Sequence, residues 1–423
     1  MYIEKVELEN FRGFAGKHEI VLHPELAVFA GVNGSGKSAV LDAVGSVLSG
    51  VVSLTQEGIP KVWYPPTPRN SIHVGCDYAR WELRFKQPPR SVASLGVYFP
   101  NRATLPGSDT RKEFGFLGRL SDARVADDLP MMAYVHSSSS RIPRPHGEVD
   151  GLSGRMLAYR GAFDSEALQF SALQAWYEQE ENLENQAKIE LGDFEVDRPS
   201  LRAVRKALSR GIGVLNHCML GKTGVWREHG EDPLQPAKGR LFITKGEKRL
   251  FIDQLSDGER RIVFLILDTA RRMVMLNPHL EDPTLASGIL AVDEVELHLH
   301  PQWQRNVVAC LRAAFPKLQL LLSTHSPIVL SSVPNACVVL MGPGGVLAGK
   351  AQTYGRDPNT ILAFEMDTPL HPAVVQTKLD ALSVALNTNL RKAKKILKEL
   401  EGSLGQDHPE LVRSRAYLGL LGG

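Results

Sequence analysis

The sequence predicts an α/β fold whose central strands are buried on both faces of a sheet. Three short apolar runs, residues 26–30, 289–292 and 318–322, carry this expectation because none of them alternates with polar residues. A glycine-rich segment, residues 31–36, joins the first run to a further apolar segment, Leu41–Leu48, which we interpret as a helix. A strand, a tight loop and a helix in this order are typical of α/β proteins.

Composition sets the limits of the interpretation. The chain has 423 residues, of which 43% are hydrophobic, enough for a large core and more than one domain or subdomain. A net charge of +2 does not favour a general polyanion binder. The cysteines lie far apart, as in a reduced cytosolic protein without structural zinc: Cys76, Cys218, Cys310 and Cys337. The N-terminus resembles a strand rather than a signal peptide, and no apolar run could cross a bilayer, so we expect a cytoplasmic protein with no membrane partner.

The loop after the first strand predicts a phosphate site. Its sequence, GVNGSGKS, fits the pattern G-x-x-x-x-G-K-[ST], in which backbone N–H groups at a helix start surround a phosphate. Lys37 would reach the β and γ phosphates of ATP, and Ser38 would bind Mg²⁺. The alternative is a glycine-rich turn with a surface lysine. The predicted nucleotide-binding residues are Gly31, Asn33, Gly34, Ser35, Gly36, Lys37, Ser38 and Ala39.

A pair of carboxylates ends the second apolar run. Asp293 and Glu294 follow residues 289–292, where ligands bind in open α/β sheets. We expect Asp293 to hold Mg²⁺ and Glu294 to orient and deprotonate an attacking water. Such a run ending in Asp-Glu is a weak signal alone, but it becomes strong beside the glycine-rich loop.

Two further elements have both a functional and a structural interpretation. His325 follows residues 318–322 and would lie at the same sheet edge as Glu294, where it could contact the γ-phosphate; the alternative is a packed core histidine. Ser256 precedes a long amphipathic segment and Glu259 follows three residues later, which predicts a capping box. On spacing alone, the capping box is the favoured interpretation of this second element.

The order of these motifs resembles that of ABC-type ATPase heads of the RecF, SMC and OLD class. The resemblance implies a mixed β-sheet with the phosphate loop, and pairs of heads in which the signature motif of one closes on the ATP of the other. It also implies that Arg12, in the segment ENFRGF, points towards the nucleotide, whereas the alternative is an arginine in a solvated turn. The implied signature residues are Leu255, Ser256, Asp257, Gly258 and Glu259.

Four regions follow from these assignments. Residues 1–150 form the first part of the head, with candidate strands at Ile72–Cys76, Trp81–Phe85 and Met131–Val135. Residues 151–240 form a mainly helical insertion, 241–372 the second part of the head, and 373–423 a helical tail. No sustained heptad repeat separates Ser38 from Leu255, so the long arms of SMC proteins are not expected.

The insertion and tail resemble those of the PtuA ATPases of Septu-type antiphage systems and of retrons. This resemblance implies a homodimer or larger homo-oligomer, an HNH nuclease partner of the PtuB type, and contact with nucleic acid through that complex. The chain itself shows no nuclease motif. The tail would dock the nuclease or, equally, cap its own head or join copies of the chain. A RecF-like DNA repair ATPase is the main alternative, and a transporter ATPase subunit is disfavoured by Arg12 and by the insertion.

Overall fold

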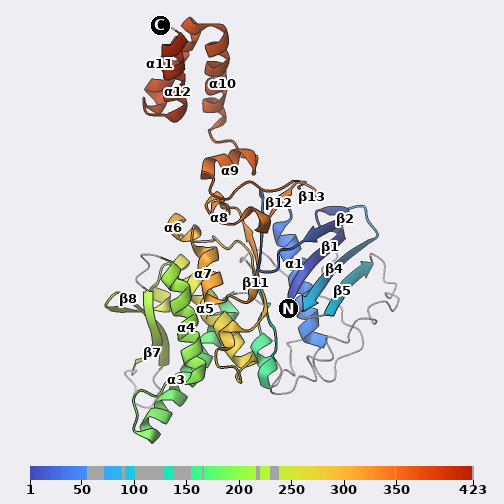
Figure 1. The fold of residues 1–423 in the computed structure, drawn as a ribbon, viewed down its shortest axis with the longest axis vertical. Helices are drawn as coiled ribbons and strands as arrows, with labels where there is room; N and C mark the ends of the chain where they lie inside the picture. Colours follow the sequence, from blue (N-terminus) through green and yellow to red (C-terminus); the bar gives the residue numbers. More distant parts are fainter. Residues whose placement is uncertain are drawn as a thin grey trace. The chain divides into compact units, whose positions relative to one another are not determined.

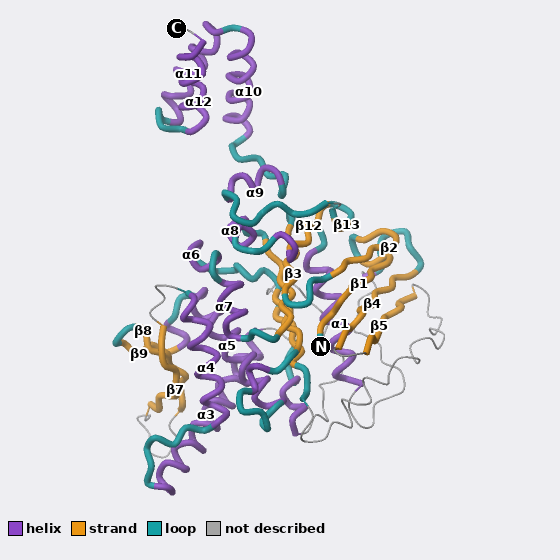
Figure 2. Tube along the Cα trace, viewed as in Figure 1, coloured by secondary structure: helices purple, strands orange, loops and turns teal. Residues whose placement is uncertain are grey.

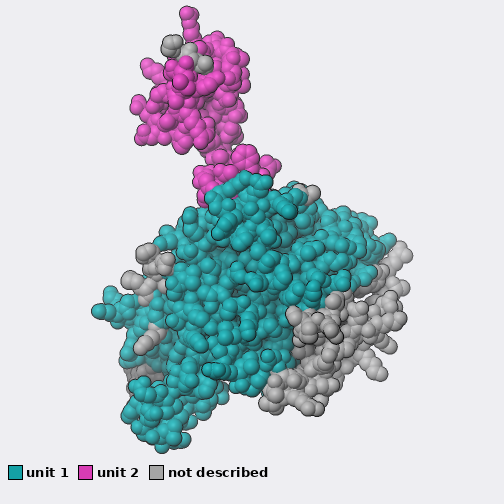
Figure 3. Space-filling view, in the orientation of Figure 1, with its two compact units in different colours: residues 1–356 teal, residues 357–423 magenta. Residues whose placement is uncertain are grey.

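The computed structural model shows a chain of two compact units, residues 1–356 and 357–423 (Figures 1 and 3). The structure describes residues 1–54, 71–87, 91–100, 128–136, 154–163, 166–215, 220–228, 238–347 and 349–421. Each unit has a buried apolar core of its own.

A six-stranded sheet has the order β13-β12-β3-β11-β10-β6. Figure 2 shows orange strands, with β3 labelled, between α1 and the helices α5 and α7 at the centre of the first unit. Neighbouring strands from β12 to β6 are parallel, and β13 runs antiparallel to β12. Every residue of β3, β6, β10 and β11 is buried, which confirms the predicted α/β class with strands covered on both faces. The strands are β3 (Leu26–Ala30), β6 (Met131–Val135), β10 (Gly288–Val292), β11 (Leu318–Thr324), β12 (Val338–Gly342) and β13 (Gly345–Val346).

A second, antiparallel sheet has the order β2-β1-β4-β5. Its strands are β1 (Tyr2–Phe11), β2 (Phe14–Val21), β4 (Tyr78–Gln87) and β5 (Ser91–Pro100). Helix α1 (Lys37–Leu54) lies between the two sheets and contacts strands of both (Figure 1). Trp81 of β4 fixes one side of this contact, because its buried Nε1 donates to Ser46 Oγ of α1 at 2.9 Å.

One predicted strand is wrong. Ile72 forms a single bridge with Phe11, and the chain then turns at Gly75, whose φ of +88° leaves the strand region of backbone space. Residues 72–76 therefore form a turn rather than a strand. The other two predicted strands are confirmed, since they lie within β4 and β6.

The predicted insertion, residues 151–240, contains helices and the beginning of a small sheet of order β7-β8-β9, which continues beyond residue 240 and is followed by α5. Helix α4 packs against α5 and α7, and α3 contacts β7 and β8. The elements are α3 (Glu166–Leu191), α4 (Pro199–Val214), β7 (Leu220–Glu228), β8 (Lys238–Lys245), β9 (Lys248–Phe251) and α5 (Asp257–Leu276). The described part of this unit also contains short helices: η3 (Gly154–Tyr159), η4 (Ile252–Gln254), η5 (Pro283–Leu285), α6 (Pro301–Gln304), α7 (Val307–Ala314), α8 (Pro327–Ser331) and η6 (Asn335–Cys337).

The second unit is helical, as predicted for the tail. It contains α9 (Pro358–Phe364), α10 (Ala373–Thr388), α11 (Leu390–Leu404) and α12 (Pro409–Leu421). Leu382, Leu400 and Leu411, from three different helices, meet in its buried core. Within the part of the chain that the structure describes, no helix has both the length and the apolar character needed to span a membrane.

Candidate functional site

The glycine-rich segment forms a tight loop between β3 and α1, so the predicted strand, loop and helix are confirmed. A Cβ at Gly31 would lie 2.1 Å from the backbone oxygen of Met341, which leaves no space for a side chain. Gly36 has a φ of +96°, and a Cβ there would lie 2.8 Å from the ring of Phe14. Only glycine therefore fits these two positions without strain.

Lys37 is the first residue of α1 and folds back over the loop. Its Nζ donates to the carbonyl oxygens of Gly31 and Val32, both at 2.9 Å, and the residue is only 4% exposed. Burial lowers the pKa of Lys37 to about 8, although nearby carboxylates oppose the change. A buried cation held by neutral carbonyls is suited to an incoming anion.

The two predicted Mg²⁺ ligands meet at the carboxyl edge of the sheet. Asp293 follows β10, and Ser38 lies in the first turn of α1. Ser38 Oγ donates to Asp293 Oδ1 at 3.0 Å, although 255 residues separate them in the sequence. A hydroxyl and a carboxylate are hard oxygen donors of the kind that Mg²⁺ prefers.

Two residues that the sequence did not single out orient Asp293. Ser323, near the end of β11, donates its hydroxyl to Asp293 Oδ1 and accepts the Glu294 N–H at 2.8 Å. Arg261 of α5 donates to the Asp293 backbone oxygen at 2.9 Å. The signal for Ser323 in the sequence was its place near the end of a buried apolar run.

Glu294 and His325 end adjacent strands, β10 and β11. Burial and the charge of Asp293 raise the pKa of Glu294, which strengthens it as a base. Burial and the charge of Lys37 lower the pKa of His325, so its imidazole is neutral at pH 7. Glu296, also absent from the predicted site, accepts the His325 N–H at 2.6 Å and thereby links the two strand ends.

The segment that resembles the signature motif begins helix α5. Ser256 caps the helix by accepting the Glu259 N–H, while the Glu259 carboxylate accepts the Ser256 N–H at 3.1 Å, which confirms the capping box. Gly258 packs tightly against the turn after the acidic pair, because a Cβ there would lie 2.5 Å from the backbone oxygen of His298. The helix start is thus fixed to the same loop that follows Glu294.

Arg12 lies in the turn between β1 and β2, with a φ of +50°. Its guanidinium pairs with Asp42 of α1, whose other oxygen accepts the Tyr134 hydroxyl at 2.8 Å. Asp42 is one helical turn beyond Ser38, so Arg12 is attached to the helix that carries the phosphate loop. Its expected approach to the nucleotide stays a prediction.

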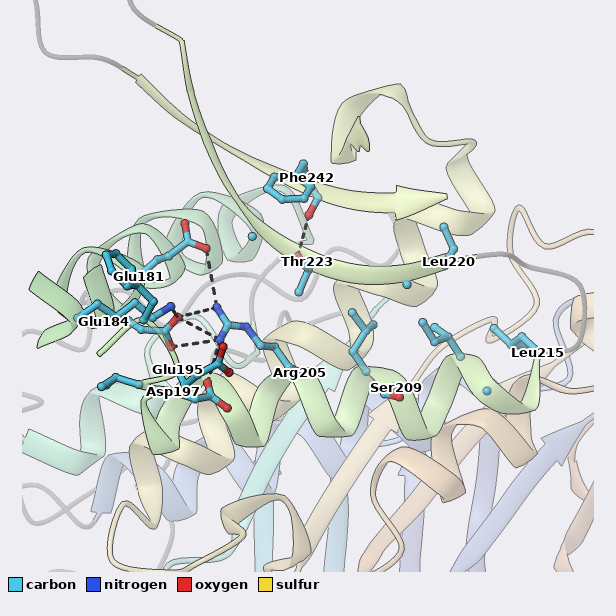
Figure 4. Close-up of a pocket in the computed structure, with 18 residues that line it drawn as sticks. Glu181, Glu184, Glu195, Asp197, Arg205, Ser209, Leu215, Leu220, Thr223 and Phe242 are labelled. Carbon is cyan, nitrogen blue, oxygen red and sulfur yellow. Dashed lines mark hydrogen bonds and ion pairs between the residues drawn. The ribbon is translucent and has the colours of Figure 1, made fainter. Parts of the chain in front are cut away.

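A separate cavity of about 1050 Å³ lies among α3, α4, β7 and β8 (Figure 4). Arg205 of α4 reaches across it to Glu184 of α3, with N–O distances of 3.1 to 3.2 Å. Among the described residues, none of those that line it belongs to the predicted nucleotide site. This cavity is therefore distinct from the site at the sheet edge.

The residues at the sheet edge fit a magnesium nucleotide by their chemistry. The loop provides backbone N–H groups at a helix start, Lys37 provides a buried positive charge, and Ser38 and Asp293 provide oxygen ligands. The remaining predicted positions lie in the same loop and helix start: Asn33 and Gly34 are exposed, whereas Ser35 and Ala39 are buried. The structure thus brings residues 31–39, 293, 294 and 325 to one edge of the sheet.

Sequence comparisons identify relatives of the chain. Retron Ec83 probable ATPase of Escherichia coli is 26% identical over 402 residues, which cover 81% of this chain and 72% of that protein. Retron Vc95 probable ATPase of Vibrio cholerae serotype O1 biovar El Tor is 37% identical over 146 residues, 34% of this chain and 28% of the relative. Septu protein PtuA of Bacillus mycoides is 37% identical over 90 residues, 21% of this chain and 12% of PtuA.

A solved SMC head bound to the C-winged helix domain of ScpA aligns with 83% of this chain and 98% of its own, at 16% identity and a TM-score of 0.48. Residues 5–86 match a family described as an AAA domain. Residues 108–331, more than half of the chain, match a family described as "AAA domain, putative AbiEii toxin, Type IV TA system". The chain therefore belongs to this family of AAA domains.

Proposed function

We propose that the chain binds Mg²⁺ and ATP at the carboxyl edge of the central sheet and hydrolyses the nucleotide. The observation that carries this proposal is the hydrogen bond between Ser38 and Asp293, which unites the two expected metal ligands beside the buried Lys37. The names of the retron relatives, both probable ATPases, support it.

Each residue has a chemical role in this proposal. Mg²⁺, when bound, neutralises phosphate charge; Ser38 and Asp293 would hold it. Lys37 releases its carbonyl partners and binds phosphate oxygens. Glu294 accepts a proton from the attacking water, for which its raised pKa makes it a stronger base. Neutral His325 can donate one hydrogen bond to a phosphate oxygen while its backbone N–H stays on Glu296.

We propose that two chains share their nucleotides head to tail. The start of α5 carries backbone N–H groups and the Ser256 hydroxyl, which donates to Glu259 within the chain; groups of these kinds bind an anion at a helix N-terminus. Residues 255–259 of one chain would thus complete the site that residues 31–38 form in the other. The order of the motifs along the chain, which resembles that of ABC-type ATPase heads, supports this arrangement.

The variant Glu294→Gln tests this function. It keeps the size and hydrogen-bonding capacity of the side chain but removes the base, so we expect hydrolysis to fall by at least roughly a hundredfold. ATP should then hold the variant in a dimer or larger assembly, which light scattering after gel filtration detects. Glu281→Gln, an exposed carboxylate outside the site, is the matched control. Parental hydrolysis by Glu294→Gln would refute the assigned base, and no ATP-dependent assembly would refute the shared site.

We further propose that the ATPase regulates a separate HNH nuclease in defence against phage. The Septu PtuA and retron names of the relatives support this, although the chain spans only 12% to 72% of the lengths of these three relatives. Affinity capture of the tagged chain from its native host, followed by mass spectrometry, tests it. Recovery of a small HNH protein is the expected result. Recovery of recombination proteins or DNA alone would instead indicate a RecF-like repair ATPase.

A further inference from the structure

A chain of three polar side chains connects strand β8 to the start of α5. Ser256 Oγ donates to Glu259 Oε2 at 2.8 Å, and the other carboxylate oxygen, Oε1, accepts from Lys245 Nζ at 2.6 Å. Glu259 is buried, and Lys245 is half-buried, at the end of β8. The serine that would face the neighbouring nucleotide is therefore held by its own helix.

The charge of Glu259 determines what Ser256 can do. Burial acts to raise the pKa of Glu259, but hydrogen bonds from Lys245 and Ser256 outweigh it and hold that pKa below its usual value. Glu259 is thus ionised at pH 7, and an ionised carboxylate only accepts hydrogen bonds. Ser256 has a single hydroxyl proton, which it gives to Glu259. It cannot donate that proton to a phosphate until it leaves Glu259.

Lys245 competes with Ser256 for the same carboxylate. An ammonium group at 2.6 Å makes a charge-assisted hydrogen bond, the stronger class of hydrogen bond in proteins. By satisfying much of the charge on Glu259, it makes the carboxylate a weaker acceptor for the serine. The cost of turning the hydroxyl outward is lower with Lys245 in place than without it.

Lys245 ends strand β8, which is attached to β7 and α3. Strand β8 pairs with β7, and Thr223 Oγ1 of β7 also donates to the Phe242 oxygen of β8 at 2.8 Å (Figure 4). Helix α3 is attached to both strands: Glu181 accepts the Val225 N–H at 2.8 Å, and Gln174 donates to the Gly239 oxygen at 2.9 Å. A displacement of α3 would therefore move the strand that ends at Lys245.

We infer that Lys245 is a positioning residue for the shared nucleotide site. Its hydrogen bond to Glu259 weakens the carboxylate as an acceptor, so that the Ser256 hydroxyl can turn to the phosphate of the nucleotide bound by a neighbouring chain. The inference rests on the proposed head-to-tail function and deepens it. The inference also gives α3, β7 and β8 a role in regulating the site. A partner that moves these elements would change the hydrogen bond between Lys245 and Glu259, and hence the free-energy cost of releasing the Ser256 hydroxyl from Glu259.

Lys245→Met in the Glu294→Gln background tests the inference. Methionine keeps an unbranched apolar stem but removes the ammonium, so Glu259 keeps the serine. We expect the ATP concentration for half-maximal assembly to rise about tenfold, because a symmetric pair uses two such contacts. Binding of a fluorescent ATP analogue to the monomer should not change. Lys245→Arg should restore assembly, and Lys248→Ala, an exposed lysine across the same hairpin, is the matched control.

A double-mutant cycle with Glu259→Gln separates this role from simple packing. Glutamine preserves the capping box but carries no charge, so it holds the serine weakly whether or not Lys245 is present. We expect Lys245→Met to have less than a twofold effect in that background. An equal effect in both backgrounds would overturn the inference, as would unchanged assembly of Lys245→Met on its own.

Failure of the inference about Lys245 can be distinguished from failure of the proposed head-to-tail function. If the Glu294→Gln parent does not assemble with ATP, the head-to-tail function is refuted directly. If the parent assembles and Lys245→Met assembles at the same ATP concentration, only the inference fails. If Lys245→Met lowers the thermal midpoint, the ATP concentration for half-maximal assembly is instead compared between Lys245→Arg and Lys245→Gln. Both side chains retain a hydrogen-bond donor, but only arginine carries a charge.

Discussion

Lys37 shows at the scale of one residue how burial prepares a binding group. Its ammonium is almost inaccessible to solvent, and within the described part of the chain its hydrogen-bond partners are neutral oxygens. Its pKa of about 8 records that this environment disfavours the charge. A triphosphate would reverse the preference, because an adjacent anion favours the protonated form.

This reversal predicts the pH dependence of nucleotide affinity. Below about pH 8, Lys37 is charged with or without nucleotide, so the group causes no pH dependence. Above that pH the free chain must take up a proton to bind, because the pKa is higher in the complex. Affinity should then fall by up to about tenfold per pH unit. Titration with a fluorescent ATP analogue from about pH 7 to about pH 9.5 measures it.

Lys37→Met is the control for that titration. It lacks the titrating ammonium, so we expect weaker binding at every pH but no decline that sets in above about pH 8. A parallel decline in both proteins would show that another group titrates, and a flat profile for the parent would contradict the role of Lys37.

The sequence predicted the residues of the site better than it predicted their hydrogen-bond and ion-pair partners. The spacing of the phosphate loop predicted Lys37 and Ser38, and the end of a buried strand predicted Asp293. Ser323 and Glu296 were missed, because their roles consist of hydrogen bonds across a sheet whose strand order no local pattern reveals. The ion pair of Arg12 with Asp42 was likewise invisible, since it depends on how α1 crosses the N-terminal sheet.

At the scale of elements, α1, the helix that follows the phosphate loop, packs closely against β6. Gly45 of α1 faces the ring of Tyr134, and a Cβ there would lie 2.5 Å from Tyr134 Cδ1. That ring cannot move freely, because it is fully buried and its hydroxyl donates to Asp42. The helix and strand therefore approach closely at Gly45, where a larger residue would meet the Tyr134 ring.

Gly45→Ala should for this reason destabilise the first unit. Alanine normally favours a helix over glycine by about 1 kcal/mol, but overpacking a rigid core contact costs about 1 to 3 kcal/mol. We expect a lower thermal midpoint. Gly213→Ala in α4 is the matched control, because no atom lies within 4 Å of its Cβ position, and it should be neutral or stabilising. A stabilised Gly45→Ala would show that Tyr134 can yield.

Strands and helices were predictable from the sequence where burial of apolar side chains alone determines the local structure. Uniformly apolar runs gave β3, β10 and β11, because only strands buried on both faces accept such sequences. The Ile72–Cys76 prediction failed because its alternating pattern was broken by a left-handed glycine that the sequence alone does not reveal. The small β7-β8-β9 sheet, which extends from the predicted insertion past residue 240, was not predicted, since no local pattern reveals the contacts of β7 and β8 with α3.

At the scale of the whole molecule, the chain divides its stability between two cores. In the second unit, Leu382, Leu400 and Leu411 are at most 1% exposed and come from three successive helices. The sequence predicted these helices but could not decide whether they dock a nuclease, cap the head or join copies. A variant that unfolds only this unit would separate its role from that of the ATP site.

Leu400→Asp is that variant. Burying an unpaired carboxylate costs several kcal/mol, comparable to the total stability of a unit of this size at about 0.1 kcal/mol per residue. We expect hydrogen exchange to accelerate throughout residues 373–421, while exchange in residues 1–356 and the affinity for ATP stay unchanged. Lys398→Asp, an exposed site on the same helix, should leave exchange unaltered.

Loss of ATP affinity in Leu400→Asp would contradict two independent cores. If both cores behave as expected, loss of a captured nuclease by this variant alone would assign docking to the tail, and its retention would place docking on the first unit.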